Sequence, residues 1–96
     1  MRVTFHGAAR DDLAEAVTFY NARSKGLGDA LAAEVRATIV QLNDQPEAGY
    51  QVRPTVRRAL LRRFPYSLLY HTSDRQVRIL AVMHHRREPE YWADRI

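Results

Sequence analysis

Four side chains in the second half of the chain could carry out acid–base chemistry on a phosphodiester: Arg63, His84, His85 and Tyr91. Cleavage of RNA by its own 2′-hydroxyl needs a base, an acid and a cation that faces the phosphorane. Histidine titrates near neutral pH and suits the first two roles, and an arginine supplies the cation. A structural interpretation competes with this one, in which one histidine closes the end of a sheet and the other is solvated.

Arginine is concentrated in the same half of the chain. The protein has 15 basic and 11 acidic residues, a formal net charge of +4, and a single lysine, Lys25. Residues 53–87 contain nine arginines and one acid, Asp74. Because the guanidinium fork binds phosphate or carboxylate through two hydrogen bonds, we expect a phosphate- or target-binding surface formed by Arg57, Arg58, Arg62, Arg63, Arg86 and Arg87. A solvated rim or a bias in composition would give the same pattern.

The composition argues against several classes of protein. The chain has no cysteine, and therefore no disulfide framework and no cysteine metal site. His84 and His85 are adjacent, and adjacent strand residues point to opposite faces, so we expect no metal and no cofactor. The longest apolar run, residues 79–83, is far shorter than the ~20 residues of a membrane helix, and no signal peptide is evident. We expect a cytoplasmic protein with one domain, residues 1–96.

The first half of the sequence predicts a strand followed by a helical hairpin. Val3 and Phe5 mark the strand, which ends at Gly7. A helix over about residues 8–24 is predicted by apolar residues at helical spacing: Leu13, Ala16, Val17 and Tyr20. Gly26 is a natural left-handed cap. A second helix over about residues 27–43 has a buried stripe formed by Leu27, Leu31, Val35, Thr38, Ile39 and Leu42.

The second half predicts three strands after a loop at residues 47–55. The strands cover residues 56–63, 66–71 and 77–84, and residues 72–75 form a turn. The last strand is apolar on both faces, with Val77, Ile79, Ala81 and Met83 on one and Leu80 and Val82 on the other. We therefore expect it to be central. Tyr66 and Tyr70 are expected in the core. The tail, residues 86–96, predicts a final helical turn. Trp92 could either pack in the core or stack on the bases of a nucleic acid.

The predicted fold class is α+β with the order β-α-α-β-β-β. An apolar sheet face must be covered, so the helical hairpin is expected to pack on one face of a small, mostly antiparallel, four-stranded sheet. The other face, or one end of it, is expected to be open and to carry the arginines of the strands. Arg57, Arg58, Arg62 and Arg63 should then point in pairs to the two faces.

Several sequence blocks together resemble a known family. They are Asp12-Leu13-x-Glu15-Ala16-x-x-Phe19-Tyr20, Gly26-Leu27-Gly28, Pro46-Glu47-x-Gly49, residues 57–66 ending Arg63-Phe64-Pro65-Tyr66, Leu69-Tyr70, and residues 79–92 ending His84-His85-Arg86-Arg87-x-Pro89-x-Tyr91-Trp92. In order and spacing the chain is similar to the RelE/ParE toxins of type II toxin–antitoxin systems, and most similar to their ParE-like, plasmid-stabilisation branch. The resemblance covers nearly the whole chain.

The resemblance implies a toxin that a co-encoded antitoxin neutralises through a largely disordered segment. ParE-like members inhibit DNA gyrase, whereas RelE-like members cut mRNA on the ribosome. Arg63 matches an arginine with which RelE-like enzymes hold phosphate, so an endoribonuclease that needs no metal is the alternative. RelE itself relies on lysines, however, and Lys25 lies in the predicted helical turn. A degenerate toxin that only binds its partner is a further alternative.

An acidic antitoxin segment that folds on binding would suit an arginine-rich surface and an exposed helical hairpin. We expect the following residues to contact it: Leu13, Val17, Tyr20, Leu31, Val35 and Trp92. The same surface could instead serve self-association. The expected partners are thus the antitoxin, in a hetero-oligomer or beside a homo-oligomer, and either DNA gyrase or the ribosome with its mRNA as the target, with no membrane.

Overall fold

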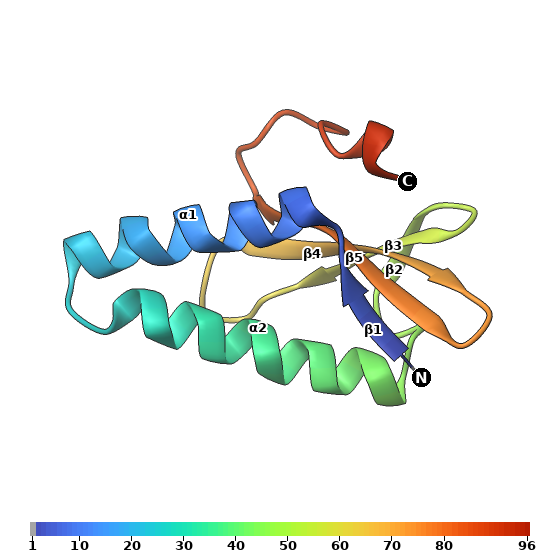
Figure 1. Ribbon diagram of the computed structural model, residues 1–96, viewed down its shortest axis with the longest axis horizontal. Helices are drawn as coiled ribbons and strands as arrows, with labels where there is room; N and C mark the ends of the chain where they lie inside the picture. Colours follow the sequence, from blue (N-terminus) through green and yellow to red (C-terminus); the bar gives the residue numbers. More distant parts are fainter. Residues whose placement is uncertain (1) are drawn as a thin grey trace.

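The computed structural model describes residues 2–96, which form two helices, five strands and a short 3₁₀ helix (Figure 1). In chain order these are β1 (Arg2–Phe5), α1 (Gly7–Arg23), α2 (Leu27–Asp44), β2 (Tyr50–Arg53), β3 (Val56–Leu60), β4 (Tyr66–Ser73), β5 (Gln76–His84) and η1 (Ala93–Arg95). The strand order in the sheet is β1-β5-β4-β3-β2. β1 runs parallel to β5, and the other neighbouring strands are antiparallel.

The α+β class is confirmed, but the sheet has five strands where the sequence predicted four. The added strand is β2, which lies within residues 47–55, the predicted loop. β2 is only four residues long and pairs with β3 through a tight hairpin, for example Tyr50 with Arg58. A strand this short is too brief to show a convincing alternation of apolar and polar residues. β5 lies between β1 and β4, so its predicted central position is confirmed.

The two helices are joined by a turn in which Gly26 is left-handed, with φ of 84°. The side chain of Asn21 in α1 closes this turn, because its oxygen accepts a hydrogen bond from the backbone of Gly28 at 2.7 Å. The helices cross closely here, and a Cβ atom at Gly28 would lie 2.1 Å from the carbonyl oxygen of Val17. The predicted helical hairpin is confirmed.

Both helices pack on one face of the sheet and enclose the main core (Figure 1). Its buried members from the sheet are Tyr66, Leu68, Tyr70, Val77, Ile79 and Val82, and those from the helices are Ala9, Ala16, Leu31, Val35 and Leu42. Tyr66 and Tyr70 are therefore core residues, as predicted. The hydroxyl of Tyr70 donates to the carbonyl of Pro46 and accepts from the backbone N–H of Gly49.

A bulge in β5 changes which residues face the helices. Leu69 pairs with Ala81 and Tyr70 pairs with Ile79, which leaves Leu80 as an extra residue. Leu80 and Ala81 then both pack on the second face, and Val82 returns to the helical face. The predicted alternation, with Ala81 beside Ile79 and Leu80 beside Val82, is wrong because a bulge inserts one residue into the pleat.

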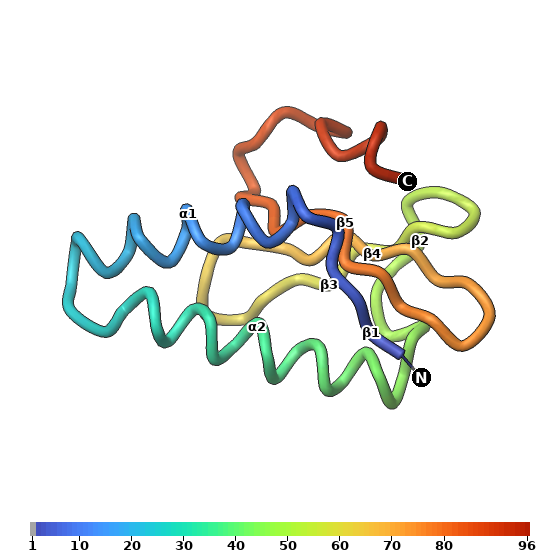
Figure 2. Tube along the Cα trace, in the orientation of Figure 1, coloured from blue at the N-terminus to red at the C-terminus, as the bar shows by residue number. Residues whose placement is uncertain are grey.

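The second face of the sheet is covered in part, which is compatible with the prediction that this face, or one end of it, is open. The C-terminal segment folds back over the strands on the side away from α2 (Figure 2). Trp92, 4% exposed, completes a second core with Val56, Leu69, Leu80, Ala81 and Met83. The predicted final helical turn is present as η1. Within residues 2–96, neither helix combines the length and the apolar character that crossing a membrane would require.

Candidate functional site

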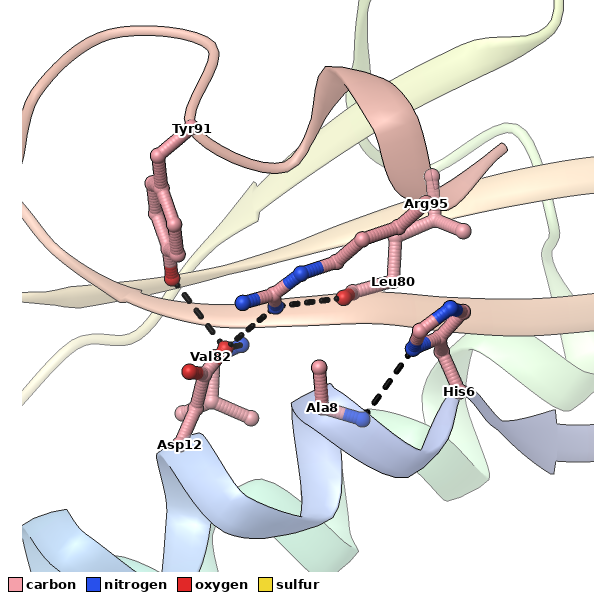
Figure 3. Close-up of polar contacts among 7 residues, drawn as sticks. All are labelled: His6, Ala8, Asp12, Leu80, Val82, Tyr91 and Arg95. Atoms are coloured by element: carbon pink, nitrogen blue, oxygen red, sulfur yellow. Dashed lines mark hydrogen bonds and ion pairs between the residues drawn. The ribbon is translucent and has the colours of Figure 1, made fainter.

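One carboxylate, that of Asp12 in α1, joins the helix, β5 and the C-terminal tail (Figure 3). Its Oδ2 atom accepts hydrogen bonds from the backbone N–H of Val82 at 3.2 Å, the hydroxyl of Tyr91 at 3.1 Å and the guanidinium of Arg95 at 2.8 Å. The same nitrogen of Arg95 also donates to the carbonyl of Leu80. β1 ends at Phe5, opposite Ile79, so Asp12 and Arg95 satisfy backbone groups of β5 that β1 no longer reaches.

The environment of Tyr91 keeps its hydroxyl protonated. Burial and the neighbouring carboxylate of Asp12 raise the pKa of Tyr91 from 10.0 to about 12. The guanidinium groups of Arg87 and Arg95 lie over its ring, 4.2 and 4.8 Å from the centroid. Tyr91 therefore acts as a hydrogen-bond donor to Asp12 at neutral pH and is poorly suited to act as a general base.

A pocket of about 300 Å³ lies beside this network. It is lined by Asp12, Glu15, Ala16, Phe19, Tyr66, Val82, His84, Arg87 and Tyr91. The ring of His84 packs edge-on against Tyr66, with 5.0 Å between centroids. The Nδ1 atom of His84 accepts a hydrogen bond from the backbone N–H of Arg86 at 3.0 Å. His84 thus closes the end of β5 and shares this pocket with Tyr91.

His85 lies with different partners. Its Nε2 atom is 3.0 Å from the hydroxyl oxygen of Ser67, which also accepts a hydrogen bond from Nε of Arg58 at 2.9 Å. Ser67 is fully buried, and it alternates with Tyr66 and Leu68 of the main core, so it faces the second side of the sheet. Ser67 was not predicted as a site residue. A lone serine within an apolar strand was the only signal, and its partners are distant in sequence.

The candidate catalytic residues are only partly brought together. His84 and Tyr91 share a pocket, whereas His85 belongs to the Arg58–Ser67 pair on the second face. Arg63 lies in the bend after β3, where its guanidinium is 5.5 Å from the ring centroid of Phe64. Arg63 does not line the pocket that holds His84 and Tyr91.

The sequence had predicted that the four arginines of residues 57–63 lie in pairs along one strand, and this prediction is wrong. β3 ends at Leu60, so only Arg57 and Arg58 lie in it. Arg57 shares the face of its partner Tyr70 and donates to the carbonyl of Gly49 at 2.8 Å, and Arg58 points to the opposite face. Arg62 and Arg63 lie in the following bend, where Glu34 of α2 accepts hydrogen bonds from both backbone N–H groups.

Four of the predicted target-binding arginines gather at one end of the sheet. The bend that contains Arg62 and Arg63 is tied to the turn after β5, because the N–H of His85 donates to the carbonyl of Pro65 at 2.9 Å. Arg86 and Arg87 lie in that turn, and all four residues are exposed. We call the surface formed by Arg62, Arg63, Arg86 and Arg87 the basic end.

The residues predicted to bind an antitoxin are divided among four environments. Leu31 and Val35 are buried on the side of α2 that faces the main core, and Trp92 lies in the second core. Tyr20 is half-buried and contacts Phe64 and Tyr66, and Val17 is also half-buried. Leu13 and Val35 line a groove of about 460 Å³ between α1 and α2, which we call the interhelical groove. Its other lining residues are Phe5, Arg10, Ala14, Ala32, Arg36 and Ile39.

Among residues 2–96, no group of three or more His, Asp or Glu side chains is arranged to hold a metal ion.

Comparison with known proteins gives both a family and a fold. A family model described as "ParE toxin of type II toxin-antitoxin system, parDE" matches residues 3–89. Among solved structures, the chain is similar to the "Chromosomal ParDE TA system from P. aeruginosa", with a TM-score of 0.76 and 18% sequence identity. This match covers 88% of the present chain and 95% of the other, and at this identity it concerns the fold alone. No match was found among the curated proteins.

Proposed function

Because the chain belongs to the ParE toxin family of type II toxin–antitoxin systems, we propose that it is a toxin that inhibits DNA gyrase without cutting nucleic acid. A co-encoded antitoxin neutralises it. The observation that carries this proposal is the dispersal of the candidate catalytic residues. His84 and His85 have separate partners, and Arg63 lies away from the pocket that holds His84 and Tyr91.

The electrostatics of the site favour contact over cleavage. Cleavage needs a base and an acid on opposite sides of one phosphate, with a cation beside it. Tyr91 is held protonated by burial and by Asp12, which raise its pKa to about 12. The hydrogen bonds that Tyr91 and Arg95 donate to Asp12 instead hold the tail against β5. The four arginines of the basic end are exposed, and of these only Arg87 contacts the tail, where its guanidinium lies over the ring of Tyr91. We assign target contact to these four arginines.

The interhelical groove suits the antitoxin. Its floor is apolar, with Phe5, Leu13 and Ile39, and Arg10 and Arg36 are exposed among its lining residues. An amphipathic segment with apolar anchors at helical spacing and acids on its flanks would bury this floor and pair with both arginines. Of the residues predicted from the sequence, this assignment retains Leu13, which is half-buried, and Val35 only as a buried residue of the groove wall.

The target is tested by adding the purified chain to DNA gyrase and measuring the supercoiling of a relaxed plasmid. We expect inhibition, and we expect the variant Arg62→Gln, Arg63→Gln, Arg86→Gln, Arg87→Gln to lose at least tenfold in potency. Arg10→Gln with Arg36→Gln is the control and should inhibit as the parent does. Normal supercoiling at a large excess of parent chain would overturn the proposal, as would cleavage of ribosome-bound mRNA that is lost in His85→Ala.

The antitoxin site is tested by calorimetry with a peptide that covers the disordered segment of the co-encoded antitoxin. Reversal of two charges at the groove, Arg10→Glu with Arg36→Glu, is expected to weaken binding at least tenfold because it places like charges opposite the acids. The matched control reverses Arg2 and Arg78, which are exposed strand residues outside the groove. Equal weakening by both pairs would count against the groove.

A further inference from the structure

Three arginines lie at the opposite end of β4 and β5 from the basic end, beside the turn that joins these two strands. The backbone N–H of Arg2 donates to the carbonyl of Arg75 at 2.9 Å, which joins β1 to the turn between β4 and β5. Arg78 follows in β5, and all three residues are exposed. Their guanidinium groups form no hydrogen bond or ion pair with other residues of the described range 2–96. We call Arg2, Arg75 and Arg78 the basic corner.

The pleat places Arg2 and Arg78 on the second face of the sheet. Val3, Val77 and Ile79 belong to the main core on the helical face, so the residues that alternate with them point away from the helices. Arg78 pairs with Thr4 on one side and with His71 on the other. The second face therefore carries, next to the tail, a polar and cationic strip that spans β1, β5 and β4.

The composition of this strip selects one class of partner. A protein partner would need an apolar centre, and a single-stranded nucleic acid would need aromatic rings for base stacking. The strip has no apolar centre and no Phe, Tyr or Trp side chain. Its exposed side chains are Arg2, Ser73, Gln76 and Arg78, and Thr4 and His71 are half-buried between them. Asp74, in the turn beside Arg75, is the one acid in residues 71–78.

We propose that the basic corner binds the phosphate backbone of double-stranded DNA. Neighbouring strands lie ~4.8 Å apart and successive residues rise ~3.3 Å, so the Cα atoms of Arg2 and Arg78 lie about 8 Å apart. Two flexible side chains at this separation can reach successive phosphates of one strand, and guanidinium groups bind phosphate through paired hydrogen bonds. Binding of this kind does not depend on the base sequence.

The proposal is tested by the fluorescence anisotropy of a labelled 20-base-pair duplex titrated with the purified chain at several salt concentrations. Each phosphate contact contributes ~0.9 to the slope of log affinity against log salt. The variant Arg2→Gln, Arg75→Gln, Arg78→Gln should therefore flatten this slope by about 2 to 3 and weaken binding at least tenfold at low salt. Circular dichroism of the variant checks that it is folded.

The matched control removes the same charge from the helices, with Arg10→Gln, Arg23→Gln and Arg36→Gln, and should bind the duplex nearly as the parent does. Absence of duplex binding, equal losses in the two triple variants, or stronger binding to a single strand of the same length would each overturn the assignment. Gyrase is absent from this assay, so its result and the result of the supercoiling test are independent.

Discussion

At the scale of single residues, Asp12 is the side chain on which most of the site depends. Its carboxylate accepts from Val82, Tyr91 and Arg95, and the side chains of Asp12 and Arg95 are only 16% and 14% exposed. We expect Asp12→Asn to lower the free energy of unfolding by about 2 kcal/mol, because it leaves a largely buried guanidinium without its counter-ion. Urea unfolding measures this. The control is Asp11→Asn at the exposed neighbouring position, and equal stability of the two variants would contradict the assigned role.

Tyr91 gives the site a dependence on alkaline pH. Folding raises its pKa from 10.0 to about 12, so the folded state holds the proton over a range in which the unfolded state releases it. The free energy of unfolding must therefore fall as the pH rises from 10 toward 12, whereas below pH 10 the contribution is fully present. Burial also raises the pKa values of Tyr66 and Tyr70. The comparison of parent with Tyr91→Phe in urea at pH 9 to 12 isolates the effect, and parallel curves would refute it.

The sequence indicated which residue types could form a site, but it did not indicate which side chains would contact one another. The histidines, the arginines and Tyr91 stood out by type, but their partners did not. Ser67 meets His85 across 18 positions, and Asp12 meets Arg95 across 83. Pairings of this length are decided by the register of the strands and the path of the tail, and neither leaves a local pattern in the sequence.

At the scale of elements, the close crossing of α1 and α2 depends on the absence of a side chain at Gly28. A Cβ atom there would lie 2.1 Å from the carbonyl oxygen of Val17, and backbone cannot move aside cheaply. We expect Gly28→Ala to destabilise the fold by about 3 kcal/mol, at the upper end of the cost of overpacking. Gly7→Ala, in the first turn of α1, meets no atom within 4 Å and should be neutral or slightly stabilising. Thermal unfolding that ranks the two variants otherwise would contradict this packing.

The tail is a second element whose contribution can be measured. Trp92 is buried over the second core, Arg53 lies 5.2 Å from its ring centroid, and Arg53 also pairs with Glu90. We expect Trp92→Ala to lower stability by about 3 to 5 kcal/mol, as is usual for a buried aromatic residue. Ile96→Ala, at an exposed position, should change little. A tail that was loosely attached would instead give two variants with the same melting temperature.

The elements marked by local sequence patterns were predicted well, and those set by strand pairing were not. Both helices, the Gly26 cap and the central β5 follow from local patterns. β2 forms because it pairs with β3, and the bulge at Leu80 arises from the register between β4 and β5. The same holds for the second core. A single tryptophan in an irregular tail gives no indication of which face of the sheet it will cover.

At the scale of the whole molecule, the positive charge is distributed over separate surfaces. The basic end, the basic corner and the interhelical groove lie at different places on the sheet and helices, and each contains at least two exposed arginines. An arginine-rich composition with a net charge of +4 suits an anionic partner but does not by itself identify one, whereas the fold shows which arginines lie together. An antitoxin in the interhelical groove would cover the helices and would leave the basic end, to which we assign target contact, exposed.

The most direct test is to express the chain alone in growing bacteria and to measure DNA synthesis and protein synthesis by pulse labelling. We predict that DNA synthesis falls first, with filamentation and an SOS response, and that co-expression of the antitoxin restores growth. An early fall in protein synthesis with codon-linked cuts in mRNA would contradict gyrase as the target and support a ribosome-dependent nuclease. Unchanged growth would contradict toxicity itself and support a chain that only binds its antitoxin.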